Sequence, residues 1–93
     1  MDLIFDDQLV GKISDAAQEG SWFMGSITLS PFGTSLVKFF AFMTDESGEL
    51  SESDFDSKLL DEKNWWISDQ GERKAISLPA VYIDDNSVYW RWA

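Results

Sequence analysis

Short runs of alternating apolar and polar residues mark the N-terminal third of the chain. Residues 3–13 predict two short strands joined by an acidic turn at 6–8, because Asp favours turns and β-branched residues favour strands. A loop or a short helical turn is expected over 15–20. A third strand is predicted over 21–29, where Gly25 marks a bulge or a site of close packing.

The same alternation returns in the C-terminal third. Residues 64–78 predict a hairpin around the Gly-containing turn 69–72, and Pro79 ends it. Residues 81–92 predict a last hairpin around the turn 84–87. Both ends of the chain therefore supply antiparallel strands.

The segment 36–43 is built mainly from aromatic and aliphatic residues that recur at helical spacing. This spacing favours a helix capped by Thr34 or Ser35, although a buried central strand would show a similar apolar run. In either case the Phe side chains of the segment are predicted to lie in the core.

Acidic residues are concentrated in 45–62, which holds eight acids and one base and so carries seven of the ten net negative charges of the chain. Within it, Phe55, Leu59 and Leu60 fall at the spacing of a short docked helix, with Asp54 or the serine before it as the cap. The rest of the segment is predicted to be a solvated loop.

These patterns predict an α+β fold in a single domain over residues 1–93. We expect an antiparallel meander of about six or seven short strands, with one or two helices from the middle of the chain packed on one face. Hydrophobic residues make up 44% of the chain, so the apolar surface is large enough to fold it despite a net charge of −10.

Composition excludes several kinds of chemistry. The chain has no Cys and no His, so it cannot build a zinc site from thiolate and imidazole, or a Ser–His–Asp catalytic site. The acid-rich stretches 45–49 and 54–56 do not place Gly and Glu where a calcium-binding EF-hand loop needs them. We therefore expect a protein that is not an enzyme and that uses no metal and no cofactor.

The N-terminal sequence lacks the basic start and the long apolar run of a signal peptide. The longest apolar run, 39–43, is far shorter than a membrane-spanning helix, and the negative charge would be repelled by an anionic lipid surface. Together with the absence of Cys, these features predict a cytoplasmic protein that does not bind membranes.

Net charge gives the clearest indication of a partner. Seven basic residues against 17 acidic ones disfavour direct contact with nucleic acid, whereas an acidic surface attracts basic proteins. We therefore expect an inhibitor-like protein that binds a basic protein, such as a toxin or enzyme that acts on nucleic acid. The expected partner-binding residues are Asp45, Glu46, Glu49, Glu52, Asp54, Asp56, Asp61, Glu62, Trp65 and Trp66.

Two other functions fit the same sequence. The chain could be a self-associating assembly subunit, such as a homodimer, whose acidity serves solubility. It could also be a carbohydrate-binding module that uses Trp65, Trp66 or Trp90. Neighbouring residues on a strand face opposite sides, so one of Trp65 and Trp66 is expected outside the core, although most of the five Trp residues should be buried.

A resemblance adds to this interpretation. The stretch 3–16, followed by Trp22 and Gly25, and the closing residues 90–92 resemble short bacterial proteins of the acidic, immunity-protein type, which neutralise secreted toxins. The resemblance covers the two ends of the chain and assigns no functional residue. It implies a bacterial interaction protein.

Overall fold

The computed structural model describes residues 1–44 and 52–93 of the chain. In these residues it forms seven strands, two helices and two single turns of 3₁₀-helix. The strands are β1 (Asp2–Phe5), β2 (Gln8–Glu19), β3 (Trp22–Leu29), β4 (Trp65–Asp69), β5 (Glu72–Ala75), β6 (Ala80–Tyr82) and β7 (Ser87–Trp90). The helices are α1 (Pro31–Thr34) and α2 (Val37–Met43), and the 3₁₀ turns are η1 (Glu52–Asp54) and η2 (Glu62–Asn64).

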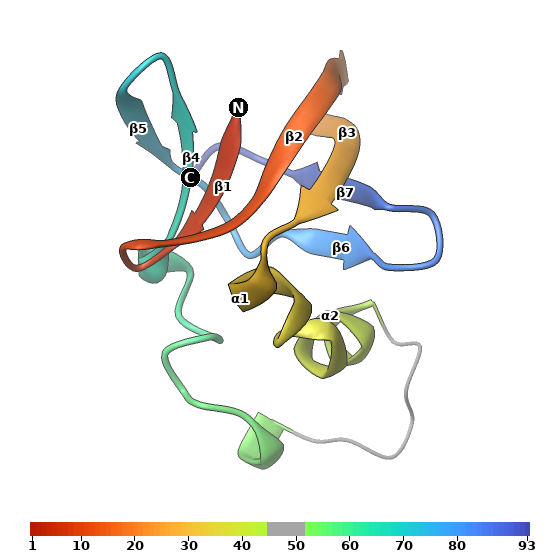
Figure 1. The fold of residues 1–93 in the computed structure, drawn as a ribbon. Helices are drawn as coiled ribbons and strands as arrows, with labels where there is room; N and C mark the ends of the chain where they lie inside the picture. The colour runs from red at the N-terminus through yellow and green to blue at the C-terminus, as the bar shows by residue number, and fades with distance from the viewer. Residues whose placement is uncertain (45–51) are drawn as a thin grey trace.

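The strands form one antiparallel sheet in the order β5-β4-β1-β2-β3-β7-β6. The sheet is curled, and α1 and α2 lie together at one end of it (Figure 1). The α+β prediction, with about seven strands and helices from the middle of the chain, is confirmed. No helix in the described residues is long and apolar enough to cross a membrane.

The core lies between the inner face of the sheet and α2. Phe39 and Phe40 of α2 are buried in the same cluster as Trp65, Ile67 and Trp90 from the strands. The helix predicted over 36–43 is therefore confirmed, and the alternative of a central strand is wrong. A seven-residue helix is too short to be stable alone, so its buried Phe side chains hold it in place.

Strand β2 is longer than the sequence predicts. The loop expected over 15–20 is wrong, because β2 continues to Glu19 and pairs with β3 as far as Trp22. A register shift between Ser14 and Ala17 places a bulge there, and Asp15 adopts a φ of 55°. This part of β2 contains no β-branched residue, so pairing with β3, rather than local preference, makes it extended.

Gly25 confirms the prediction of close packing. A Cβ at this position would lie 2.8 Å from Cγ2 of Ile13 and 3.0 Å from the Ser14 carbonyl oxygen on the neighbouring strand. Any side chain here would force β2 away from β3, next to the bulge.

Helix α1 is not among the elements predicted from the sequence. Ser30 is the cap, and its hydroxyl oxygen accepts a hydrogen bond from the Gly33 N–H at 3.0 Å. Thr34 and Ser35 were expected to cap the next helix, but their hydroxyls donate to the carbonyls of Ser30 and Phe32, and α2 has no side-chain cap. Both hydroxyls thus donate to backbone carbonyls three or four residues earlier in the chain, within a helical turn that the apolar spacing does not predict.

Gly33 permits α1 to lie directly on β2. A Cβ at this position would stand 1.9 Å from the carbonyl oxygen of Val10, which is backbone and cannot rotate away. The contact between α1 and β2 therefore requires glycine.

The described part of the acidic segment forms short turns, so the predicted helix around Phe55 is wrong. Asp56 accepts the Lys58 N–H and Asp61 accepts the Lys63 N–H, each at 3.0 Å. Such bonds from an Asp side chain to the backbone two residues on favour turns over helix. The expected docking is nevertheless present, because Leu59 is buried.

The last residues of the chain connect edge strand β5 with β7, the strand next to the opposite edge of the sheet. Ile76, just after β5, forms a bridge with Trp92, just after β7. On either side of it, the Ser77 N–H donates to the Arg91 carbonyl at 2.9 Å and the Ala93 N–H to the Ala75 carbonyl at 3.1 Å. The residues that follow β5 thus lie beside those that follow β7.

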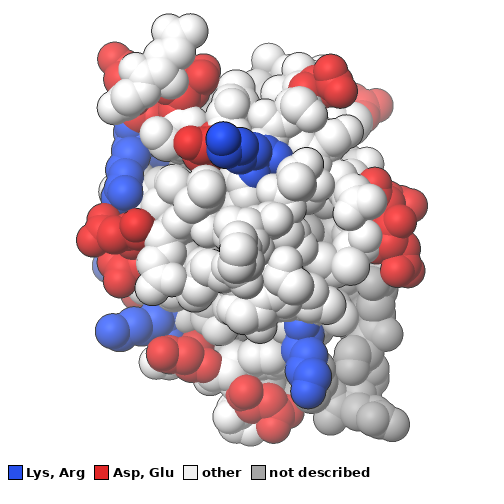
Figure 2. All heavy atoms as spheres, viewed as in Figure 1, with Lys and Arg blue, Asp and Glu red and all other residues white. Residues whose placement is uncertain are grey.

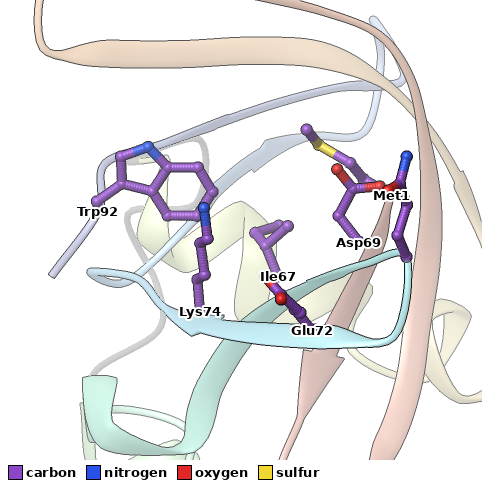
Figure 3. A pocket seen from close by; sticks show the side chains of 7 residues that line it. Met1, Ile67, Asp69, Glu72, Lys74 and Trp92 are labelled. Atoms are coloured by element: carbon purple, nitrogen blue, oxygen red, sulfur yellow. The ribbon is translucent and has the colours of Figure 1, made fainter.

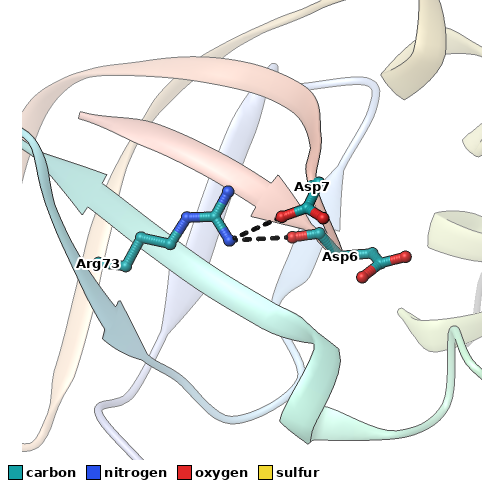
Figure 4. A network of polar contacts seen from close by, with 3 residues as sticks. All are labelled: Asp6, Asp7 and Arg73. Atoms are coloured by element: carbon teal, nitrogen blue, oxygen red, sulfur yellow. Dashed lines mark hydrogen bonds and ion pairs between the residues drawn. The ribbon is translucent and has the colours of Figure 1, made fainter.

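An ion pair lies over strands β5, β4 and β1, on the face of the sheet that is turned away from the core. Arg73 of β5 reaches over β4 to the β1–β2 turn, where its guanidinium donates to the Asp6 carbonyl and to an Asp7 carboxylate oxygen, both at 3.2 Å (Figure 4). Both side chains are exposed, so the pair is screened by solvent.

Candidate protein-binding surface

The acidic residues proposed as a binding segment are only partly placed. Asp54, Asp56, Asp61 and Glu62 are exposed. Asp45, Glu46 and Glu49, and the side chain of Glu52, lie outside the described residues. Figure 2 shows acidic groups around the whole margin of the molecule, so negative charge on the described surface is not confined to this segment.

Trp65 is a core residue, and the expectation that it contacts a partner is wrong. It is fully buried, and its indole Nε1–H donates to the Leu59 carbonyl at 2.9 Å. Its ring stacks on Phe39, with centroids 6.1 Å apart, and lies 5.0 Å from Phe5. The contact with Leu59 ties the end of the acidic segment to the start of β4.

Trp66 points to the opposite side of β4, as predicted for neighbours on one strand. It is half-buried beside Ile4, its partner in the register with β1. Trp90 is fully buried like Trp65, so the carbohydrate-binding hypothesis loses two of its three named tryptophans. Of the five Trp residues only Trp65 and Trp90 are fully buried, so the expectation that most of them lie in the core is wrong. Trp66 is half-buried, and Trp22 and Trp92 are 40% and 39% exposed.

Trp22 belongs to an apolar groove on the outer face of β3, β7 and β6. The register pairs Met24 with Tyr89, and Tyr89 with Ala80, so their side chains line up across three strands. The groove has a volume of about 410 Å³. We call this the outer groove, and it is lined by Glu19, Trp22, Met24, Ala80, Tyr82 and Tyr89.

The sequence contains part of the signal for the outer groove. Trp22, Met24 and Ser26 alternate with core residues on β3, so their side chains lie on the outer face. What the sequence does not give is that β7 lies next to β3 and adds Tyr89. Only the strand order brings these apolar side chains together.

Each of the exposed indole rings, Trp22 and Trp92, has a cation of this chain near its face. The Arg91 guanidinium lies 4.8 Å from the ring centroid of Trp22, and the Lys74 ammonium lies 5.5 Å from that of Trp92. Both distances fall within the range of cation–π attraction. Each of these two indole rings therefore already has a cation partner within the chain.

A second hollow lies beside Trp92. Its volume is about 230 Å³, and in Figure 3 Lys74 stands next to Trp92 while Asp69 and Met1 lie on the other side, with Ile67 between them. Asp69, Glu72 and Lys74 are all exposed. Because the hollow carries charges of both signs in contact with water, it does not select a ligand of either charge.

Searches against family models, curated proteins and solved structures found no match to this chain. No group of three or more acidic side chains close enough to hold a metal ion occurs in the described part of the chain.

Proposed function

We propose that this chain is a non-catalytic binding protein that recognises a basic protein partner through the outer groove. The observation that carries this proposal is the presence of Trp22, Met24, Tyr82 and Tyr89 in one apolar groove on the surface of a strongly acidic chain. Trp, Tyr and Met are enriched at the centres of protein interfaces, where a few of them supply most of the binding energy.

The groove suits a protein partner because its floor is a sheet. Its side chains project from four neighbouring strands, β2, β3, β7 and β6, so their positions are fixed before a partner arrives and little conformational entropy is lost on binding. Tyr and Trp also have few rotatable bonds for the area they present.

Charge supports a basic partner. The chain carries a net charge of −10, and Glu19 lies in the groove itself. A negative potential over the molecule accelerates encounter with a positively charged protein and disfavours acidic ones. The same charge opposes self-association through this groove, because two copies would repel each other.

We extend the proposal to an inhibitor of immunity type in the cytoplasm of a bacterial cell. The likeness of the chain ends to such proteins supports it, together with the absence of Cys. In this role the groove would anchor a basic toxin or enzyme, and the exposed acids Asp54, Asp56, Asp61 and Glu62 would guide its approach.

The test uses two matched tryptophan variants. The immobilised chain is used to capture proteins from its source cells, and each purified candidate is titrated against the wild type, Trp22→Ala and Trp92→Ala by calorimetry. We expect a basic partner whose affinity falls at least about 30-fold with Trp22→Ala, as for an interface hot spot, and much less with Trp92→Ala.

Three outcomes would contradict the proposal. The partner could prove acidic or neutral, or its affinity could be insensitive to Trp22→Ala. Alternatively, sedimentation could show a stable dimer that Trp22→Ala dissociates, in which case the groove joins two copies of this chain.

Raising the salt concentration should weaken capture, because screening reduces attraction between the two proteins.

A further inference from the structure

The outer groove ends in a corner formed by two tyrosines and a carboxylate. Tyr82 on β6 and Tyr89 on β7 meet edge to face, with ring centroids 5.5 Å apart and planes at 86°. A hollow of about 170 Å³ beside them is lined by Tyr82, Asp85 and Tyr89. We call these three residues the aromatic corner.

The aromatic corner differs in charge from the two exposed indoles. Trp22 and Trp92 each have a cation of this chain over the ring, Arg91 and Lys74 respectively. In the described residues, which include all seven Lys and Arg side chains, neither tyrosine ring has such a neighbour. Asp85 and the adjacent Asp84 are exposed and bring negative charge to this end of the groove.

We infer that the aromatic corner binds one lysine or arginine side chain of the basic partner, an inference that rests on the proposed function. In an edge-to-face pair the edge of one ring is directed at the other, so a cation in the adjoining hollow contacts the π-face of a tyrosine, and the Asp85 carboxylate beside it supplies the opposite charge. This combination of groups selects a cation over a neutral or anionic side chain.

The aromatic corner and the outer groove are continuous. Tyr82 and Tyr89 line both hollows. On one side of the tyrosine pair lies the apolar groove with Met24 and Trp22, and on the other lies the cation-binding site at Asp85. A partner segment that crosses the pair therefore needs an apolar side chain next to a basic one. This requirement is more specific than general attraction between opposite charges.

The experiment uses tetralysine and tetraarginine as probes, because they carry the proposed charge without any apolar or aromatic residue. Each is titrated into the isotopically labelled full chain, and the backbone amide signals are followed by NMR. We expect saturable shifts at Tyr82, Asp85 and Tyr89. Asp85→Asn and Tyr89→Leu should each weaken probe binding about fivefold, the change that corresponds to an exposed cation–π contact, whereas Tyr89→Phe should keep it.

Glu72→Gln is the matched charge control. It removes one negative charge from β5, at the opposite end of the strand order from β6, and should leave probe binding unchanged. The amide spectrum of Tyr89→Leu, compared with that of the wild type, shows directly whether this variant is folded. Asp85→Asn provides the same test at an exposed position where folding is not at risk.

The result that would overturn the inference is probe binding elsewhere. If the shifts concentrate at Asp54, Asp56, Asp61 and Glu62, or if Glu72→Gln weakens binding as much as Asp85→Asn, the aromatic corner is not a cation site. The proposed function would survive that result, because it depends on the effect of Trp22→Ala on a protein partner. Conversely, saturable binding at the corner together with a partner insensitive to Trp22→Ala would support the corner and contradict the proposed function.

Discussion

The four tryptophans at the extremes of burial divide the molecule into two regions. Trp65 and Trp90 lie on the inner face of the sheet and are fully buried, whereas Trp22 and Trp92 keep about two fifths of their surface in solvent. The same residue type stabilises the fold in one region and offers a contact surface in the other. Strand register and strand order decide which role each one has.

The largest effect expected from this difference is on stability. Trp65→Ala should lower the free energy of unfolding by about 4 kcal/mol, because it removes a large buried ring and leaves a cavity. A domain of this size has a total stability of about 5 to 14 kcal/mol, so the variant would lose a large fraction of it. Urea denaturation measures the loss.

Trp22→Ala is the control for that measurement. It should cost less than about 1 kcal/mol, since surface substitutions rarely cost more. A loss comparable with that of Trp65→Ala would show that the outer groove stabilises the fold and would remove the distinction between the two regions.

The next largest loss of stability is expected at Gly33, where α1 packs on the inner face of β2. Gly33→Ala should destabilise the protein by about 2 kcal/mol, because the new Cβ would overlap the Val10 carbonyl oxygen and push α1 off β2. Helix preference alone predicts the opposite sign, since Ala is the better helix former. Thermal unfolding separates the two, and a stabilised variant would mean that α1 is free to move.

Gly20→Asn supplies the matched control. Gly20 has a φ of 64° in the β2–β3 turn, with no atom within 4 Å of an added Cβ, and Asn tolerates this conformation. Its melting temperature should stay close to that of the wild type.

A smaller effect distinguishes the two buried indoles from each other. The Trp65 N–H donates to the Leu59 carbonyl, whereas the Trp90 N–H is buried without a partner in the described structure. Trp65→Phe should therefore cost about 1 kcal/mol more than Trp90→Phe, which is the net value of one hydrogen bond. Equal losses in urea denaturation would indicate that the bond contributes nothing to stability.

The smallest effect is expected on the outer face, between Arg73 and Asp7. A double-mutant cycle with Arg73→Met and Asp7→Asn should give a coupling energy of about 0.5 kcal/mol, because both side chains are exposed. The coupling should shrink as salt is added. A value several times larger that persists in high salt would mean that this ion pair behaves as a buried one.

The sequence predicts the parts of this fold that local chemistry controls. Asp6 and Asp7 mark a turn, Val and Ile mark strands, and the apolar spacing over 36–43 marks a helix. It fails where strand pairing overrides the preference of the residues themselves, as in the extension of β2 through Ala17 to Glu19, which pairs with the start of β3. The cap at Ser30 was missed for a related reason, because α1 exists only where Gly33 meets β2.

The candidate site was less predictable than the fold. The net charge favours a basic partner, but the sequence predicts the contact in an acidic segment whose described acids lie in exposed turns. Trp65 was assigned to the surface because alternation leaves open which of two neighbours faces the core. The outer groove and the aromatic corner depend on β3, β7 and β6 lying side by side, and single-sequence patterns do not contain that information.

The strand order also has a consequence for how the chain folds. Strands β1 to β3 are consecutive, but β4 returns to pair with β1 and β7 returns to pair with β3, so the late strands flank the early ones on both sides. Until they arrive, the inner side chains of the first three strands, such as Leu3 and Ile27, remain in contact with water. Pairing of this kind brings together residues far apart in sequence, and it slows folding into the range of about milliseconds to seconds. The early hairpins are therefore not a stable unit by themselves, and we expect a single cooperative transition that begins only when the end of the chain is present.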